Sequence, residues 1–547
     1  MTRSSAGRLA VAAATAAIPL LVLGIFFVLP VGGMVSRGFV QHGRLDVAGA
    51  LGVLGRPEIQ RAIWFTIWSS LAGTALSLLL GLPAAHVLHR LDFPGRTWLR
   101  ALLVVPFVLP TVVVGVAFEA LIGESGPLGG LDRTPVAIVA GLAFFNASVV
   151  IRVVGGAWES LDPRPAEAAA ALGASPMQVF RDVTFPALRP AIVSAATVVF
   201  LFCATAFGIV LTLGGLRYSS VETQIYLLTN TLLDLQAAAA LSILQLAVVV
   251  CLLLAAARAR RTPDGSLART RVRSRRPSLG DLPALLGTGA LLALVVAPLA
   301  ALAVASLRVD GDWSIANYRA LQTPGSHQAL LVPVTTALVN SLRIAVDATW
   351  MSLLLGMTVA TIITRRSRGR GERRLRAVLD AMFMLPLGVS AVTLGFGFLI
   401  TLGRPPLDLR DSPLLIPVAQ ALVALPLVVR VLAPVLSGID DRLRQAAATL
   451  GASPYQAMLV VDLPVIWKPL LAAAGFAFAC SMGEFGATSF LVRDDRPTLP
   501  VVIFRLLAHP GDLNYGMALA AAVVLGLSTA LVMLIVERLR VPSVGTF

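Results

Sequence analysis

The pentapeptide Leu172-Gly173-Ala174-Ser175-Pro176 recurs unchanged as Leu450-Gly451-Ala452-Ser453-Pro454, 278 residues further along the chain. The same shift relates three features outside the pentapeptide, namely Arg152 to Arg430, Pro186 to Pro464, and Phe207-Gly208 to Phe485-Gly486. One shared pentapeptide means little in a chain rich in alanine, glycine and leucine. Four separate matches at one offset indicate a tandem duplication.

The composition around these repeats excludes an ordinary soluble protein. Of 547 residues, 57% are hydrophobic and only 13% are charged, whereas about a quarter of the residues of a soluble domain are charged. The missing polar surface indicates that lipid surrounds much of the chain.

Twelve apolar stretches are long enough to cross a bilayer, which takes about 20 residues. We therefore predict an all-α polytopic membrane protein with 12 transmembrane helices, arranged as two tandem six-helix repeats. Each repeat has an even number of spans, so both enter the membrane in the same direction. The predicted spans are 11–35, 62–88, 99–122, 135–158, 190–213, 237–257, 283–306, 336–363, 377–402, 413–436, 469–491 and 514–536.

The basic residues, which give a net charge of +15, gather in short runs between the apolar stretches. No aromatic residues are interleaved with them, which argues against nucleic-acid binding. By the positive-inside rule the runs mark the cytoplasmic face, and twelve spans place both termini there. The predicted organisation is a first repeat over 1–257, an arginine-rich cytoplasmic linker over 258–282, interpreted as a flexible tether, and a second repeat over 283–547.

Each copy of the pentapeptide falls in a predicted cytoplasmic loop, at about 161–190 and about 439–469. The alanine-rich run before it favours a helix, and Gly173 suits the C-cap. Ser175 suits an N-cap with Pro176 in the first helical position. We expect a second short helix from there, ended by Pro186 before the next span.

The pattern Glu167-Ala168-Ala169, three residues, Gly173, then Phe185-Pro186 resembles the EAA loop of ATP-binding cassette (ABC) importer permeases. The resemblance implies that the loop's short helix is a coupling helix that docks in a groove on a cytoplasmic ATPase. Closure of two ATPase copies would then rock the halves between inward-open and outward-open states. It also implies an extracytoplasmic substrate-binding protein as a partner, and a place in the bacterial plasma membrane.

The resemblance carries the ATPase-coupling role onto matching positions of both loops. These are Glu167, Ala168, Ala169, Gly173, Ser175, Pro176, Phe180 and Pro186 in the first, and Gln445, Ala446, Ala447, Gly451, Ser453, Pro454, Met458 and Pro464 in the second. The second copy departs from the pattern, because Gln445 replaces the acidic residue and Met458 replaces Phe180. We hypothesise that the two loops are functionally unequal.

ATP hydrolysis is expected to take place in a separate chain. A phosphate-binding P-loop needs a lysine after a glycine-rich turn, and the only lysine, Lys468, precedes Pro469 with no such turn. We therefore expect no enzyme activity, no catalytic residues and no cofactor in this chain, with ATP and Mg²⁺ held by the partner. No metal site is predicted, because the cysteines lie in apolar segments and the histidines are scattered.

Polar residues inside predicted spans are costly and therefore candidates for function. We name Glu484, Phe485 and Gly486, with Phe207 and Gly208, as candidates for the translocation path. Glu484 either faces that path or orients the helix bundle. Arg343 and Asp347 lie one helical turn apart and are expected to pair.

Two repeats in one chain resemble the ferric-iron and thiamine importer permeases, and both substrates remain open at this point. The same class also carries molybdate, sulfate, polyamines or phosphonates. The rival class is an ion-coupled secondary transporter, for which the Arg343/Asp347 pair is the only suggestive feature and the paired loops have no purpose.

Overall fold

The computed structural model describes residues 16–41, 44–124, 126–215, 217–259, 275–364, 370–384, 389–403 and 407–539. Ten helices in these ranges are long and apolar enough to span a membrane. They are Ala16–Phe39 (which includes η1, Gly24–Val28, and α2, Leu29–Phe39), α4 (Pro57–Arg90), α7 (Pro135–Glu159), Met177–Ala204, α13 (Leu235–Ala259), Leu279–Ser306 (η4, Leu279–Asp281, and α14, Leu282–Ser306), α16 (Val334–Thr364), α19 (Leu415–Gly438), Met458–Met482 and α25 (Asp512–Leu539).

The predicted third and ninth spans are broken helices. In the first repeat, α5 (Arg96–Val104) and η2 (Val105–Phe107) meet α6 (Thr111–Ile122) at an angle of 105°. Pro106 and Pro110 lie at the bend, where proline removes a backbone donor and stops the helix. In the second repeat, α17 (Arg370–Met384) and α18 (Ala391–Thr401) occupy the matching place on either side of residues outside the described ranges. The all-α, twice-repeated membrane fold is confirmed.

The predicted fifth and eleventh spans, 190–213 and 469–491, are wrong as continuous helices. The fifth helix starts earlier, at α9 (Pro176–Val179), and runs through η3 (Phe180–Thr184) into α10 (Phe185–Ala204); α11 (Gly208–Gly214) is separate. The eleventh runs likewise through α21 (Pro454–Ala457), η7 (Met458–Asp462) and α22 (Leu463–Met482), followed by α23 (Thr488–Leu491). The apolar composition continues across both breaks, so hydrophobicity alone did not reveal them.

The remaining elements are short. They are α3 (Val47–Leu54), α8 (Arg164–Ala171), α12 (Val221–Asn230), α15 (Ala316–Ala320), η5 (Ser326–Gln328), α20 (Asp441–Thr449), α24 (Leu499–Ala508), and two antiparallel hairpins, β1 (Val40–Gln41) with β2 (Arg44–Leu45) and β3 (Arg308–Val309) with β4 (Asp312–Trp313). Sequence reasoning missed α24, which is apolar but too short to span a bilayer, and α12, which mixes polar and apolar residues.

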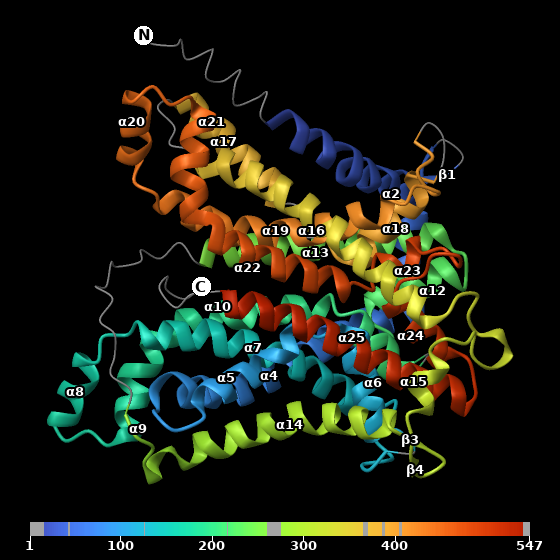
Figure 1. Cartoon of the computed structure of the whole chain (residues 1–547), viewed down its shortest axis with the longest axis horizontal. Coiled ribbons are helices and arrows are strands. Elements are labelled where there is room, and N and C mark those ends of the chain that lie inside the picture. The colour runs from blue at the N-terminus through green and yellow to red at the C-terminus, as the bar shows by residue number, and fades with distance from the viewer. Residues whose placement is uncertain are drawn as a thin grey trace.

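Each repeat places its first helix against the other repeat (Figure 1). Helix α14 of the second repeat packs on α4 and α6, where Gly287 faces the ring of Pro83. The helix containing α2 packs on α18, where the rings of Phe26 and Phe398 lie 5.9 Å apart. The two repeats are therefore interlocked rather than being two bodies joined by a tether.

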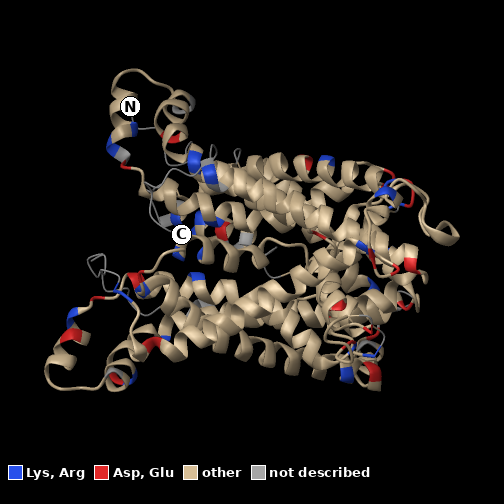
Figure 2. Ribbon diagram, turned by 60° about the horizontal axis from the view of Figure 1, so that its bottom comes forward, with Lys and Arg blue, Asp and Glu red and all other residues tan. Residues whose placement is uncertain are grey.

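The sides of the bundle present apolar residues. Trp64, Leu71 and Leu79 are more than half exposed along one face of α4. The residues 275 positions later, Val339, Val346 and Leu354, repeat this stripe on α16. Figure 2 shows that most charged residues lie towards the two ends of the molecule and that few lie in the middle. This distribution fits a belt of lipid around the middle.

The C-terminal end of the predicted linker is docked. The backbone of Arg275 bonds to Arg90 and Asp92 at the end of α4, and its guanidinium reaches Asp281 at 2.6 Å. His86 of α4 also lies 3.1 Å from Asp281. The flexible-tether interpretation is therefore wrong for 275–282, because these bonds fix it to the first repeat; residues 260–274 lie outside the described ranges.

Candidate functional site

Both repeated loops form helical hairpins at one end of the molecule, which we call the hairpin end (Figure 1). The first hairpin spans 164–184 and the second spans 441–462. Gly173 and Gly451 have φ angles of +88° and +89°, in the left-handed region that favours glycine. In the first hairpin Ala174 donates to the Ala169 carbonyl at 3.1 Å and Gly173 donates to Ala170 at 3.0 Å. These are the two bonds of a Schellman motif, so the predicted C-cap is confirmed.

A reciprocal capping box starts the second helix of each hairpin. The Gln178 N–H donates to Ser175 Oγ at 3.4 Å, and the Ser175 N–H donates to Gln178 Oε1 at 2.8 Å. Ser453 and Gln456 repeat both bonds, at 3.3 Å and 2.8 Å. The predicted N-caps are therefore present in both loops, with glutamine as the third-position partner.

Pro186 does not end this helix, contrary to expectation. The helix widens into the π-helical turn η3, where Phe185 donates its N–H to the carbonyl of Phe180. The wider turn takes in a proline at the start of α10 without a break. The second hairpin does the same at η7 and Pro464. Each hairpin is consequently continuous with a membrane helix. A force applied to the hairpin by a docked protein would therefore be transmitted along that helix.

The tips of the hairpins expose large apolar side chains. Leu172 and Leu450 are 90% and 88% exposed, and Met177 is 71% exposed. Phe180 is less exposed than these residues, because its ring stacks on Trp158 with centroids 6.4 Å apart. Glu167 and Gln445 are both exposed on the first helix of their hairpins. Such apolar tips with a polar flank fit a docking surface for another protein.

The candidate path residues meet between the repeats, towards the end opposite the hairpins. Phe207 and Phe485, which are equivalent by the 278-residue shift, stack with centroids 5.2 Å apart and planes at 20°. A second equivalent pair flanks them: Tyr226 lies 5.4 Å from Phe207, and Phe504 lies 5.4 Å from Phe485. We call these four residues the aromatic cluster. Tyr226, on the unpredicted helix α12, was missed, although the shift that relates it to Phe504 could have found it.

The two path glycines permit close backbone packing beside this cluster. A Cβ on Gly486 would lie 3.0 Å from the Cβ of Ala391, and one on Gly208 would collide with Thr111. Both contacts join the short helix after the break to the broken helix of the same repeat. The cluster is thus held by backbone contact on both sides.

Glu484 lies next to Phe485 and is 7% exposed. Its carboxylate accepts hydrogen bonds from the N–H groups of Ala487, at 2.7 Å, and Thr488, at 3.0 Å, and from the Thr488 hydroxyl. In this conformation the side chain caps the short helix α23. Arg343 and Asp347, expected to pair, form no ion pair within the described residues; Trp350 donates to Asp347 instead, at 3.3 Å.

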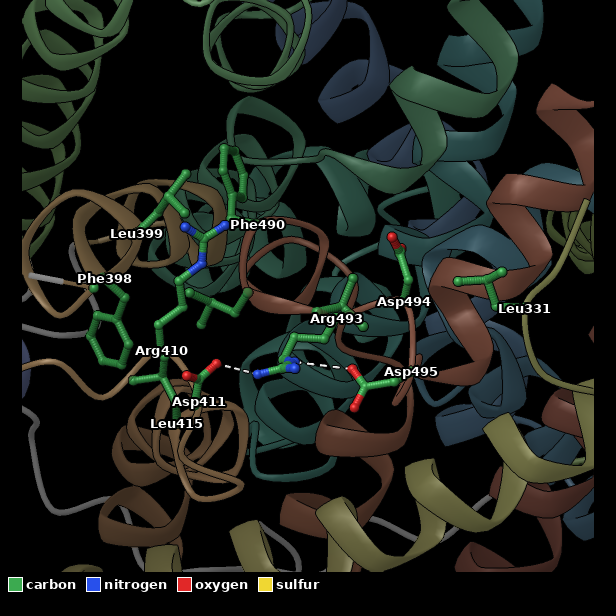
Figure 3. Close-up of a pocket in the computed structure, with 13 residues that line it drawn as sticks. Leu331, Phe398, Leu399, Arg410, Asp411, Leu415, Phe490, Arg493, Asp494 and Asp495 are labelled. Atoms are coloured by element: carbon green, nitrogen blue, oxygen red, sulfur yellow. Dashed lines mark hydrogen bonds and ion pairs between the residues drawn. The ribbon is translucent and has the colours of Figure 1, made fainter.

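An open cavity of about 590 Å³ lies beside α23, which contributes Phe490 and Leu491 to its lining (Figure 3). Phe398, Phe490 and Leu415 line its floor, and Arg493 reaches between Asp411 and Asp495 at its rim. The hydrogen bond from Arg493 holds the pKa of Asp495 below its usual range. The rings of Phe490 and Tyr226 lie 5.6 Å apart, so this cavity adjoins the aromatic cluster.

Comparison with known proteins decides the family. The family model for the binding-protein-dependent transport system inner membrane component matches twice, at 77–262 and at 352–540. The chain belongs to this family. The two matches fall in the two halves related by the internal repeat, so the chain is a fused, duplicated permease.

Related permeases align along most of the chain. The thiamine transport system permease protein ThiP of Brucella abortus (strain 2308) is 28% identical over 495 residues, which cover 87% of each protein. The protein of the same name in Escherichia coli (strain K12) is 28% identical over 88% of this permease and 89% of its own length. A probable ABC transporter permease, y4fN of Sinorhizobium fredii, is 25% identical over 87% of each.

The two hairpins of this permease differ in a charged bond between their helices. Arg444 reaches the buried carboxylate of Asp462 at 2.8 Å and so ties α20 to η7. The positions that match by the shift are Ala166 and Thr184, which cannot form this pair. The second hairpin is therefore braced by a charged bond that the first does not have.

Replacing Arg444 by alanine is expected to loosen the second hairpin alone. The buried carboxylate loses a charged partner, at a cost of about 1–2 kcal/mol. Hydrogen exchange of the amides in 441–457 should accelerate about tenfold, since about 1.4 kcal/mol corresponds to a factor of ten. Arg442→Ala is the matched control, because that arginine is exposed on the same helix. Equal exchange in both variants would show that the bond does not brace the hairpin.

Proposed function

We propose that this ABC importer permease carries thiamine across the bacterial inner membrane. The observation that supports the substrate is the alignment with thiamine permeases over 87% or more of both chains. None of the relatives described above is named for ferric iron, so thiamine is preferred to it. A binding protein would deliver the vitamin to the end opposite the hairpins.

The hairpins are the proposed docking sites for two copies of a cytoplasmic ATPase. Their exposed leucines and continuity with membrane helices support this role. In this proposal the hairpin end and both termini are cytoplasmic, and ATP and Mg²⁺ are bound by the partner. The coupling residues named from the sequence lie on or beside these hairpins, and Glu484, Phe485, Gly486, Phe207 and Gly208 line the closed part of the path.

Reconstitution tests this function. The permease is co-expressed with a candidate ABC ATPase, placed in proteoliposomes and supplied with a candidate thiamine-binding protein. We expect ATP hydrolysis to rise when loaded binding protein is added, and labelled thiamine to enter only with ATP. Fe(III) in a parallel arm should give neither response. Stimulation by Fe(III) and not by thiamine would overturn the substrate while leaving the class intact.

A further inference from the structure

The central pair of the aromatic cluster is buried, and the faces of its rings are electron-rich. Phe207 and Phe485 are 5% and 2% exposed, and their stacked faces carry negative partial charge. Among the described residues, no arginine or lysine lies over a ring of the cluster. The basic neighbour in sequence, Arg505, forms an ion pair with Asp494 at 2.6 Å. In the described ranges no cation therefore lies over these ring faces.

A buried carboxylate lies on the same face of α12 as Tyr226. Glu222 precedes Tyr226 by four residues, which is one helical turn. It is 0% exposed and accepts hydrogen bonds from Ser390 at 2.9 Å and Gln245 at 3.1 Å. Both partners are uncharged, and no cationic partner occurs in the part of the chain that the structure describes. A buried carboxylate without a cation is costly and therefore marks a site of function.

The bond from Ser390 to Glu222 joins the two repeats. Ser390 caps α18 of the second repeat, whereas Glu222 belongs to the first. The stacked pair Phe207 and Phe485 also joins the repeats. If the repeats move apart at this point, the carboxylate loses Ser390 at the same time as the rings separate. The cavity at Phe490 would then open onto both.

We propose that the aromatic cluster and Glu222 form an intramembrane binding site for a flat organic cation. When the repeats part, the cation stacks between the rings and pairs with the carboxylate, replacing the ring–ring contact and the bond from Ser390. Thiamine, with a positively charged thiazolium ring and a flat aminopyrimidine, has this chemistry. The choice of thiamine rests on the proposed function, whereas the ligand class rests on the residues.

Direct binding to the permease tests the site apart from transport. The permease–ATPase complex in nanodiscs, without binding protein, is titrated with thiamine and with thiochrome, its neutral flat oxidation product. Both titrations are run without nucleotide and with vanadate-trapped ATPase. We expect thiamine to bind in at least one state and thiochrome to bind at least tenfold more weakly, the size of a desolvated cation–π contact of about 1–2 kcal/mol.

Variants assign the binding to these residues. Glu222→Gln, Phe485→Leu and Phe207→Leu should each weaken thiamine binding about tenfold, whereas Tyr226→Phe should bind normally because Phe504 is its natural counterpart. Phe118→Leu is the packing control, since Phe118 is buried against Phe144 outside the cluster. An unchanged melting temperature shows that each variant is folded.

The outcomes separate this inference from the proposed function. Uptake of thiamine by the wild type without direct binding in either nucleotide state would overturn the site and leave the function standing. Binding without uptake would support the site and remove thiamine as the transported substrate. Binding that Glu222→Gln and Phe485→Leu leave unchanged would also overturn the site.

Discussion

Replacing Gly173 by aspartate is expected to reduce substrate uptake about tenfold or more, because strain of about 1–2 kcal/mol at φ +88° falls on the turn of the first hairpin. A Cβ there would meet no other atom within 4 Å, so its addition makes no clash with the membrane helices. The damage is confined to the shape of the hairpin. ATP hydrolysis stimulated by the binding protein should fall together with uptake.

The same change in the second hairpin is expected to have a smaller effect. Gly451 has nearly the same φ, +89°, and the same free space around it. The ion pair between Arg444 and Asp462 holds the second hairpin in shape. In addition, Gln445 replaces the acidic residue of the first hairpin, so this hairpin has no charged contact with the ATPase at that position that a distorted turn could break. Uptake and ATPase binding are measured side by side for Gly173→Asp and Gly451→Asp. Equal losses would count against functional asymmetry.

An asparagine substitution provides the control. Asparagine tolerates the left-handed region better than other non-glycine residues, so Gly173→Asn should keep most of the uptake. If Gly173→Asn were as inactive as Gly173→Asp, the loss would come from the added side chain rather than from the backbone. The exposed tip would then be the surface that cannot accept a larger residue.

Local signals made the hairpins predictable. Glycine at the C-cap and serine before proline at the N-cap act through bonds within a few residues, so their geometry follows from sequence. The exception is Pro186, which the sequence predicts to end the helix although a π-helical turn accommodates it. Proline limits which bonds a helix makes, but the sequence does not say whether a wider turn relieves the conflict.

Long-range arrangement was less predictable. The 278-residue shift singled out Phe207 and Phe485 as equivalents, but equivalence does not tell whether two residues touch. Their stacking depends on the breaks after α10 and α22, which hydrophobicity cannot show because both sides of each break are apolar. The packing of α2 and α14 against the opposite repeat likewise has no local signal. A lipid-facing helix has the same composition whether it packs against its own repeat or the other one.

The sequence allows two roles for Glu484, namely facing the translocation path or orienting the helix bundle, and substitution can distinguish them. Replacing it by alanine removes the acceptor from the N–H groups of Ala487 and Thr488 and from the Thr488 hydroxyl. Because each buried donor left unsatisfied costs about 1–3 kcal/mol, we expect a loss of at least about 2 kcal/mol and a clear fall in melting temperature. Uptake should be lost with it, since α23 carries Phe490 between the cavity and the cluster.

Glutamine at position 484 separates the two roles. Glu484→Gln keeps one acceptor oxygen at nearly the same shape, so a capping role predicts a smaller fall in melting temperature and substantial remaining uptake. A substrate-contacting role predicts the reverse, normal stability with uptake lost. Glu58→Ala, an exposed glutamate at the start of α4, should change stability by less than about 0.5 kcal/mol. Because the three bonds to Glu484 all come from its own next turn, we expect the capping result.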